Sequence, residues 1–135
     1  MTITDDWRVP SLAAFSTDCC YDQRTDYYST AMRRVGANRG QIGGLLYEVN
    51  RVTHDWLGGL LLTSVIRKKD QDWPGDGYFS CAADFGLLAA DTDKPTQRAF
   101  WYRQLRGLFT LFADPLRVAQ AEAKAASDLR MRRTW

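Results

Sequence analysis

The stretch LLLTSVIRKKDQDWPGDGYF, residues 60–79, joins an apolar run to a basic cluster, a Pro/Gly turn and an aromatic restart. The apolar run is short for a helix and contains the β-branched residues Thr63, Val65 and Ile66, so it predicts a strand. The Pro and Gly residues that follow force the chain to turn. We therefore expect a small β-hairpin here, with helices on either side of it.

Helical patterns flank this stretch. Asn38 and Gln41 have the spacing of a capping box, and the apolar stripe behind them predicts a helix that ends at the glycines 58 and 59. Gly43 and Gly44 near its start suggest that another backbone approaches closely. This stripe consists of Ile42, Leu45, Leu46, Val49, Val52, Thr53 and Trp56.

Shorter helical patterns occupy residues 26–35 and 80–88, and a short helical turn is expected at 11–15. Pro95 is placed to open a long amphipathic helix, and Asp114 with Pro115 to open a final Ala-rich one. The fold class that follows is mainly α with a small β-hairpin (α+β). The order of helix, helix, strand and turn is that of a winged helix, which is an analogy of fold.

A chain of 135 residues is long enough for one domain and too short for two ordinary ones. We interpret it as a single domain, 1–135, with an N-terminal docking segment at 1–26, a core at 27–113, and a C-terminal helix with a basic tail at 114–135. The balance of 18 Lys+Arg against 16 Asp+Glu gives a net charge of +2, which does not by itself mark a nucleic-acid-binding protein.

The cysteines favour a reducing compartment, because there are three of them and two, Cys19 and Cys20, are adjacent. His54 is the only histidine and there is no C-x-x-C pair, so neither a metal nor another cofactor is expected. The N-terminus is acidic before any apolar run, and no run approaches the roughly 18 residues of a membrane span. We expect a soluble cytoplasmic protein of a bacterium or a phage, with no membrane partner.

The basic cluster is the first candidate site. Arg67, Lys68 and Lys69 beside a turn are suited to contact the phosphates of double-stranded DNA. Arg51 on the preceding helix could read base edges. The aspartates at 70, 72 and 76 would repel phosphate, and they favour the alternative of a solvated strand edge that resists aggregation. The candidate DNA-binding set is completed by the basic tail: Arg130, Arg132 and Arg133.

A second hypothesis is a protein-interaction module, such as an inhibitor or an accessory subunit in the conflict between a bacterium and its phage. Trp73, Tyr78 and Trp135 would then be exposed anchors, since Trp and Tyr dominate binding hot spots. A homodimer is compatible with the same anchors. The arginines at 98, 103 and 106 beside Trp101 and Tyr102 resemble a stripe for single-stranded nucleic acid, but the aromatic positions coincide with the core stripe.

An enzyme is the third alternative. His54 and Asp55 are adjacent, and on a helix their side chains would point about 100° apart, which argues against a catalytic dyad. Cys81 lies where a helix dipole could activate a thiol, but cysteine is more often buried and inert. We expect no catalytic residue and a non-enzymatic binding protein.

Residues 62–82 contain T-S-V-I-x-K followed by P-G-x-G-Y-F. This resembles blocks in uncharacterised small bacterial and phage-type proteins, in which a helix precedes an L-x-S-x-V-V-x-K strand and a P-G-x-G-F turn. The resemblance covers residues 43–86 and implies no known activity. The chain departs from the pattern by an extra stretch, 69–73, before Pro74.

Overall fold

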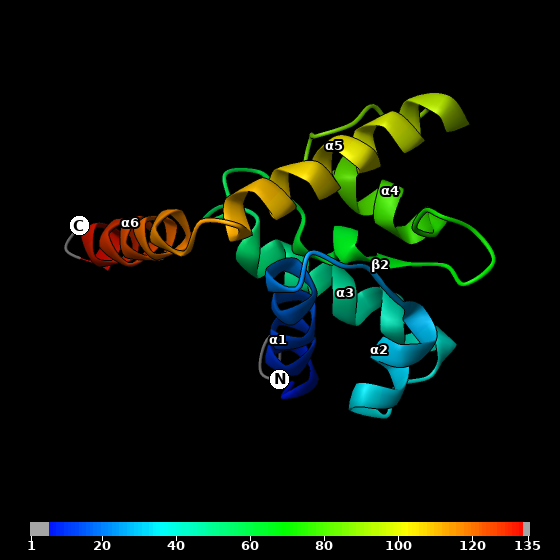
Figure 1. Cartoon of the computed structure of the whole chain (residues 1–135), viewed down its shortest axis with the longest axis horizontal. Helices are drawn as coiled ribbons and strands as arrows, with labels where there is room; N and C mark the ends of the chain where they lie inside the picture. The colour runs from blue at the N-terminus through cyan, green and yellow to red at the C-terminus, as the bar shows by residue number, and fades with distance from the viewer. Residues whose placement is uncertain (1–5, 134–135) are drawn as a thin grey trace.

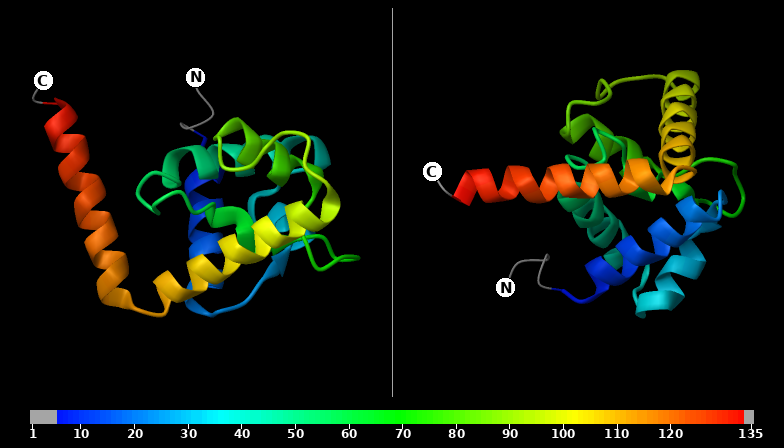
Figure 2. Two further views of the ribbon diagram at one scale, coloured as in Figure 1. Left: turned by 90° about the horizontal axis from the view of Figure 1, so that it is seen from above. Right: turned by 60° about the vertical axis from the view of Figure 1, so that its left-hand side comes forward.

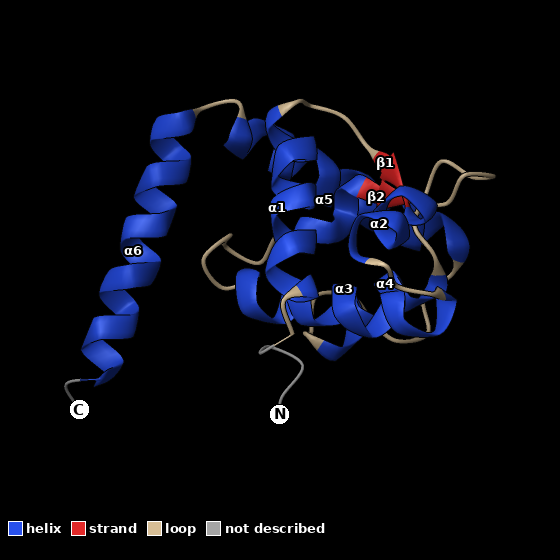
Figure 3. Ribbon diagram, turned by 90° about the horizontal axis from the view of Figure 1, so that it is seen from below, coloured by secondary structure: helices blue, strands red, loops and turns tan. Residues whose placement is uncertain are grey.

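The computed structural model describes residues 6–133, and for residue 125 and residues 128–133 it describes the backbone alone. The fold is mainly helical (Figures 1 and 3). No helix in this part of the chain is long and apolar enough to cross a membrane. In chain order the elements are α1 (Arg8–Tyr21), β1 (Asp26–Tyr27), α2 (Tyr28–Val35), α3 (Arg39–Thr53), the 3-10 helix η2 (Leu62–Val65), β2 (Ile66–Arg67), α4 (Asp76–Asp84), α5 (Lys94–Phe112) and α6 (Pro115–Arg133).

The expected β-hairpin is wrong. The two strands are two residues each and pair in parallel, Asp26 opposite Ile66 and Tyr27 opposite Arg67 (Figure 3). The wing of a winged helix is an antiparallel hairpin, and the described residues form none.

Side chains from distant helices explain why residues 62–65 form a 3-10 helix. The Thr63 amide donates to Asn50 Oδ1 (3.2 Å), and the Ser64 carbonyl accepts from Trp101 Nε1 (2.8 Å). The Leu61 amide donates to Gln104 Oε1 (2.7 Å). These contacts supply the buried backbone with the hydrogen bonds that a neighbouring strand would otherwise provide.

α1 is longer than the short turn expected at 11–15. Pro10 lies in its first turn, where the missing amide proton breaks no helical hydrogen bond. Leu12, Cys19 and Cys20 are fully buried, and the helix packs against α3 and η2. The N-terminal segment therefore contributes directly to the core.

α3 lies at the centre of the fold, and its start was predicted correctly. Asn38 Oδ1 accepts from the Gln41 amide and Gln41 Oε1 from the Asn38 amide, both at 3.1 Å. Three details differ. The helix ends at Thr53, before the glycines at 58 and 59 where its end was predicted. Val52 is 41% exposed, so it is outside the buried stripe, and a Cβ on Gly43 would meet nothing within 4 Å. Gly43 therefore faces open space and not a neighbouring backbone.

The last three helices begin at polar caps or at glycine. α4 begins at Asp76, four residues before the expected start, because the chain is already extended at Gly75 and can enter a helix there. α5 has Pro95 in its first turn, as predicted, and Asp93 Oδ1 caps the Thr96 amide (2.9 Å). Asp114 likewise accepts from the Leu116 amide at the start of α6 (3.1 Å).

α6 projects away from the other helices. It packs against the end of α5, and in two views it leaves the body at a steep angle to α5 (Figure 2). Val118 is buried at this junction, whereas Leu116 is 66% exposed.

Candidate ligand-binding cleft

A cleft of about 680 Å³ opens between α2, α3, α4 and the basic turn, which we define as residues 67–77. Its apolar lining comes from α2 and α3: Met32, Ile42 and Leu46. Four tyrosines also line it: Tyr27, Tyr28, Tyr47 and Tyr78. Ligand sites in proteins commonly have volumes of about 300–1,000 Å³, so the cleft has room for a small organic molecule.

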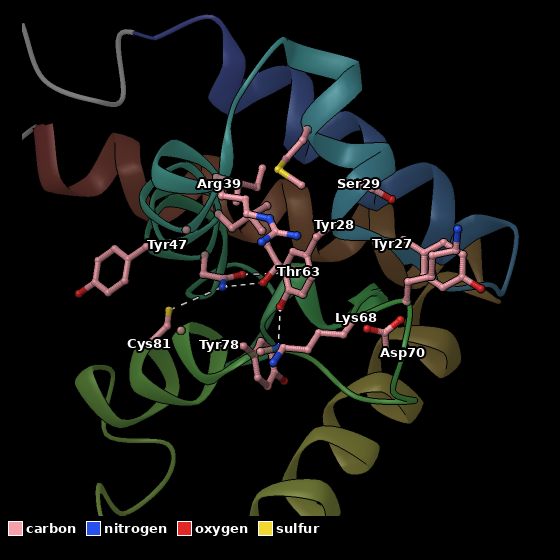
Figure 4. Close-up of a pocket in the computed structure, with 18 residues that line it drawn as sticks. Tyr27, Tyr28, Ser29, Arg39, Tyr47, Thr63, Lys68, Asp70, Tyr78 and Cys81 are labelled. Atoms are coloured by element: carbon pink, nitrogen blue, oxygen red, sulfur yellow. Dashed lines mark hydrogen bonds between the residues drawn. The ribbon is translucent and has the colours of Figure 1, made fainter.

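Three cations surround this apolar lining. Arg39 is the first residue of α3, and Lys68 and Lys69 come from the basic turn. Figure 4 shows Arg39 and Lys68 reaching toward the middle of the cleft from different elements, with Tyr28 between them. All three cations are exposed and none forms an ion pair with a described residue; Asp70 is the one acidic side chain in the lining. The cleft is therefore electropositive.

Tyr28 connects the basic turn to α2. Its hydroxyl accepts a hydrogen bond from the Gly75 amide (2.9 Å), and burial raises the pKa of this phenol. The turn is closed by a bond from the Lys68 amide to the Trp73 carbonyl (3.2 Å). A Cβ on Gly75 would come within 3.3 Å of the Lys68 Cε, so Lys68 extends over this glycine. The turn is thereby held in place at the mouth of the cleft.

The floor of the cleft is polar and neutral. Asn50, 1% exposed, donates from Nδ2 to Thr63 Oγ1 (2.8 Å) and to Cys81 Sγ (3.6 Å). Burial raises the pKa of the Cys81 thiol, which disfavours the thiolate at neutral pH. Because Asn50 bonds both Thr63 and Cys81, it fixes η2 and α4 on opposite sides of the floor.

A shallower hollow of about 700 Å³ adjoins the cleft. Both hollows are lined by Met32, Arg39 and Lys69, and the second adds Arg33. Arg33 is exposed on the last turn of α2, where a cation also complements the helix dipole. The positive lining therefore extends beyond the cleft along α2.

Two of the predicted DNA-binding residues lie apart from this lining. The Arg67 Nε donates to Thr25 Oγ1 (2.9 Å), and its guanidinium carbon lies 4.8 Å from the centre of the Tyr27 ring. Arg51 forms an ion pair with Glu48, whose side chain is 8% exposed. Both guanidinium groups are bound by side chains of this protein, so Lys68 and Lys69 alone bring the predicted basic cluster to the cleft.

The remaining predicted residues have different outcomes. Tyr78 was expected to be exposed, which is wrong: it is 6% exposed and its hydroxyl shares a hydrogen bond with Ser64 Oγ (2.7 Å). Trp73 is half-buried, with the Arg98 guanidinium 3.6 Å from its ring centre. Trp135 lies outside the described residues, as do the side chains of Arg130, Arg132 and Arg133.

His54 lies outside the cleft. Its ring stacks on Phe85 with centroids 4.6 Å apart, and its Nε2 lies 3.3 Å from Asp55 Oδ1. The expected divergence of His54 and Asp55 is wrong because α3 ends at Thr53, so helical spacing no longer separates them. No described group of three or more His, Cys, Asp or Glu side chains is arranged to hold a metal ion.

Sequence reasoning missed Arg39 and Tyr28 as cleft residues. Arg39 follows the helix cap directly, and Tyr28 was identified only as part of a helical stripe. No local signal connects either residue to Lys68, because the cleft forms only when α2, α3 and the basic turn pack together.

No family model, curated protein or solved structure matches the chain. The resemblance of residues 43–86 to small bacterial and phage-type proteins therefore stays a prediction. The geometry of the cleft carries the functional conclusion.

Proposed function

We propose that this protein is a non-enzymatic binding protein whose cleft takes an organic anion. The ligand has an apolar or aromatic body and one terminal carboxylate, sulfonate or phosphate. The single observation that carries the proposal is the presence of three cations, none of them in an ion pair with a described residue, around an apolar, tyrosine-rich cleft of about 680 Å³. An apolar lining with a few convergent polar groups is typical of small-molecule sites.

The position of the cations favours an anion with one charged end. Arg39 and Lys68 reach toward the middle of the cleft from α3 and from the basic turn, on either side of Tyr28, so both can attract the anionic end of a ligand that lies there (Figure 4). The body of the ligand would then lie against Met32, Ile42 and Leu46. Charge-assisted hydrogen bonds fix the anionic end, and burial of apolar surface adds affinity.

Binding without catalysis is supported by the chemistry of the floor. The thiol of Cys81 is the strongest nucleophile in the lining, and its burial raises its pKa, which disfavours the reactive thiolate. The only histidine, His54, is not part of the lining and cannot serve there as a general base.

The test is titration with 8-anilinonaphthalene-1-sulfonate, an aromatic anion whose fluorescence rises in an apolar site. We expect the wild-type protein to bind it, and the double variant Arg39→Gln, Lys68→Gln to bind it about tenfold more weakly. The exposed Lys124→Gln variant, on α6, serves as the control and binds like the wild type. Equal affinity in the wild type and the double variant, with both folded by circular dichroism, would refute the proposal.

A second candidate is nucleic-acid binding through the basic turn, as expected from the sequence. The observation in its favour is that Arg39 and Lys69 line both adjoining hollows, while Lys68 adds a cation to the cleft and Arg33 adds one to the second hollow. A polyanion could follow these cations along α2. In a salt series with duplex and single-stranded oligonucleotides, replacing both lysines by Gln would lower the slope of log affinity against log salt by about two. Absence of binding at low salt would rule this candidate out.

A further inference from the structure

A second concave surface lies in the angle between α5 and α6, remote from the cleft in sequence. It is a groove of about 560 Å³, lined by the loop at 57–60, the second half of α5 and the first turn of α6. We call it the arginine groove, after Arg103, Arg106 and Arg117. Its apolar floor consists of Leu57, Leu60 and Leu111.

The three arginines are exposed and form no ion pair with any described residue. No acidic side chain belongs to the lining. The nearest acid in sequence, Asp114, uses its carboxylate to cap the Leu116 amide. The groove therefore combines an aliphatic floor with an excess of positive charge.

Exposed apolar side chains lie beside the arginines. Tyr102 is 55% exposed with the Arg106 guanidinium 5.7 Å from its ring centre, and Leu116, next to Arg117, is 66% exposed. Arg and Tyr are enriched at protein interfaces and at binding hot spots.

We propose that the arginine groove binds an acidic, amphipathic segment of a partner protein. The leucines of the partner lie on Leu60 and Leu111, and its carboxylates pair with Arg103, Arg106 and Arg117. This surface is separate from the cleft, and it is where we place the partner that the protein-interaction hypothesis requires. It shares no lining residue with the cleft.

Charge distinguishes this occupant from a second copy of α6. The sequence of α6, PLRVAQAEAKAASDLRMRR, contains five basic residues against two acidic ones. A second α6 would therefore bring positive charge to a positive groove. Nucleic acid is less suited, because the lining itself is aliphatic and contains no aromatic ring on which a base could stack; the exposed Tyr102 ring lies beside the lining and not within it.

Fluorescence anisotropy tests the proposal with a labelled helical peptide that has leucines on one stripe and glutamates beside it. We expect saturable binding to the full chain. The triple variant Arg103→Gln, Arg106→Gln, Arg117→Gln should bind about tenfold more weakly. The matched control replaces three exposed cations outside the groove, Arg34, Lys94 and Lys124, by Gln and should bind like the wild type.

Two altered peptides separate the contributions of charge and apolar contact. Replacing every glutamate by glutamine, or every leucine by serine, should each abolish saturable binding. Equal affinity of the triple variant and the matched control would overturn the proposal. It would also be overturned if a single-stranded oligonucleotide bound the groove more tightly than the peptide. A wild-type dimer in sedimentation that the triple variant converts to a monomer would likewise overturn it, since the occupant would be a second copy.

Discussion

The cleft and the arginine groove both place three cations around apolar side chains, but they differ in what lies between the charges. The cleft has tyrosines and a floor fixed by buried Asn50, and the basic turn covers its mouth. The groove has three leucines and is lined by residues of α5, α6 and the loop at 57–60. The same charge therefore predicts different ligands: a small organic anion in one, an acidic protein segment in the other.

Neighbouring cations of the basic turn also differ in their contacts. Arg67 lies between Thr25 and the Tyr27 ring, whereas Lys68 and Lys69 are exposed at the cleft. Sequence places these three residues in one cluster, and the structure gives them different partners. The number of cations in a stretch says little until their contacts are known.

The largest expected effect comes from Asn50→Ala, which removes the hydrogen bonds that hold the floor of the cleft and leaves the arginine groove intact. It leaves the Thr63 amide and hydroxyl without their partner, so the free energy of unfolding should fall by about 3 kcal/mol. Urea denaturation measures this loss. Binding of the anionic probe should weaken and binding of the acidic peptide should not. A loss below about 1 kcal/mol would mean that Asn50 does not hold the floor together.

Alkaline pH should weaken the core that both sites share. Burial raises the pKa of Cys19 to about 11 and of Cys20 to about 12, from 9.0 for a free thiol. The unfolded chain therefore releases thiol protons above pH 9.0 while the folded protein retains them, so stability is complete below that pH and is lost as pH rises toward the folded values.

Between about pH 8 and pH 10 the free energy of unfolding should fall by about 3 kcal/mol. Urea midpoints across this range measure the fall. The variant Cys19→Ala, Cys20→Ala provides the comparison, because its stability should vary less with pH. A wild-type slope no steeper than that of the variant would contradict this prediction.

Two helix caps give a matched pair of smaller effects. Asn38→Ala and Asp93→Ala each remove one cap, and each should lower the free energy of unfolding by about 1 kcal/mol. Asn38 immediately precedes Arg39, so only its replacement should weaken binding of the anionic probe. Thermal denaturation and probe titration of both variants check this difference. Equal loss of probe affinity in both variants would mean that Arg39 does not contribute to binding of the probe.

The smallest effects on stability are expected from replacing Gly107 or Gly43 by alanine, and each replacement should affect binding at one site only. A Cβ on Gly107 would lie 2.8 Å from Leu60 Cδ2 and displace it from the groove floor, although alanine gains about 1 kcal/mol of helix propensity. A Cβ on Gly43 enters open space in the cleft. We expect net stability changes below about 1 kcal/mol.

The two alanine variants should have reciprocal binding defects. Gly107→Ala should weaken binding of the acidic peptide and leave binding of the anionic probe unchanged. Gly43→Ala should weaken binding of the probe and leave binding of the peptide unchanged. Titration of each variant with both probes provides the readout. Parallel losses in both variants would indicate that the cleft and the groove are coupled.

The sequence predicted features that depend on neighbouring residues. The capping box at Asn38 and the proline in the first turn of α5 were both correct. Each is specified within a single turn of helix, so no knowledge of the rest of the fold is required.

Features that depend on distant side chains were not predictable. Residues 60–66 have the composition of a strand, but Asn50, Trp101 and Gln104 satisfy the backbone there and a 3-10 helix forms. Tyr78 became part of the core for the same reason, since Ser64 in that helix binds its hydroxyl. Propensity alone cannot foresee these long-range hydrogen bonds.

The candidate sites were predictable only in part. The basic turn identified Lys68 and Lys69, but Arg39 joins them only through packing. Arg103 and Arg106 were noted in the sequence only as part of a possible stripe for single-stranded nucleic acid, and both are exposed on α5. Their role with Arg117 depends on the angle between α5 and α6, which no local pattern encodes.

One measurement tests the separation of the two sites most directly: nitrogen-15 spectra of the protein labelled at glycine. Gly43, Gly75 and Gly77 line the cleft, whereas Gly58 and Gly107 line the arginine groove. The anilinonaphthalene sulfonate should shift the first set of amide signals and leave the second in place, and the acidic peptide should do the opposite. Shifts of Gly58 and Gly107 by the sulfonate, with Gly43, Gly75 and Gly77 unmoved, would contradict the assignment of the cleft as its binding site.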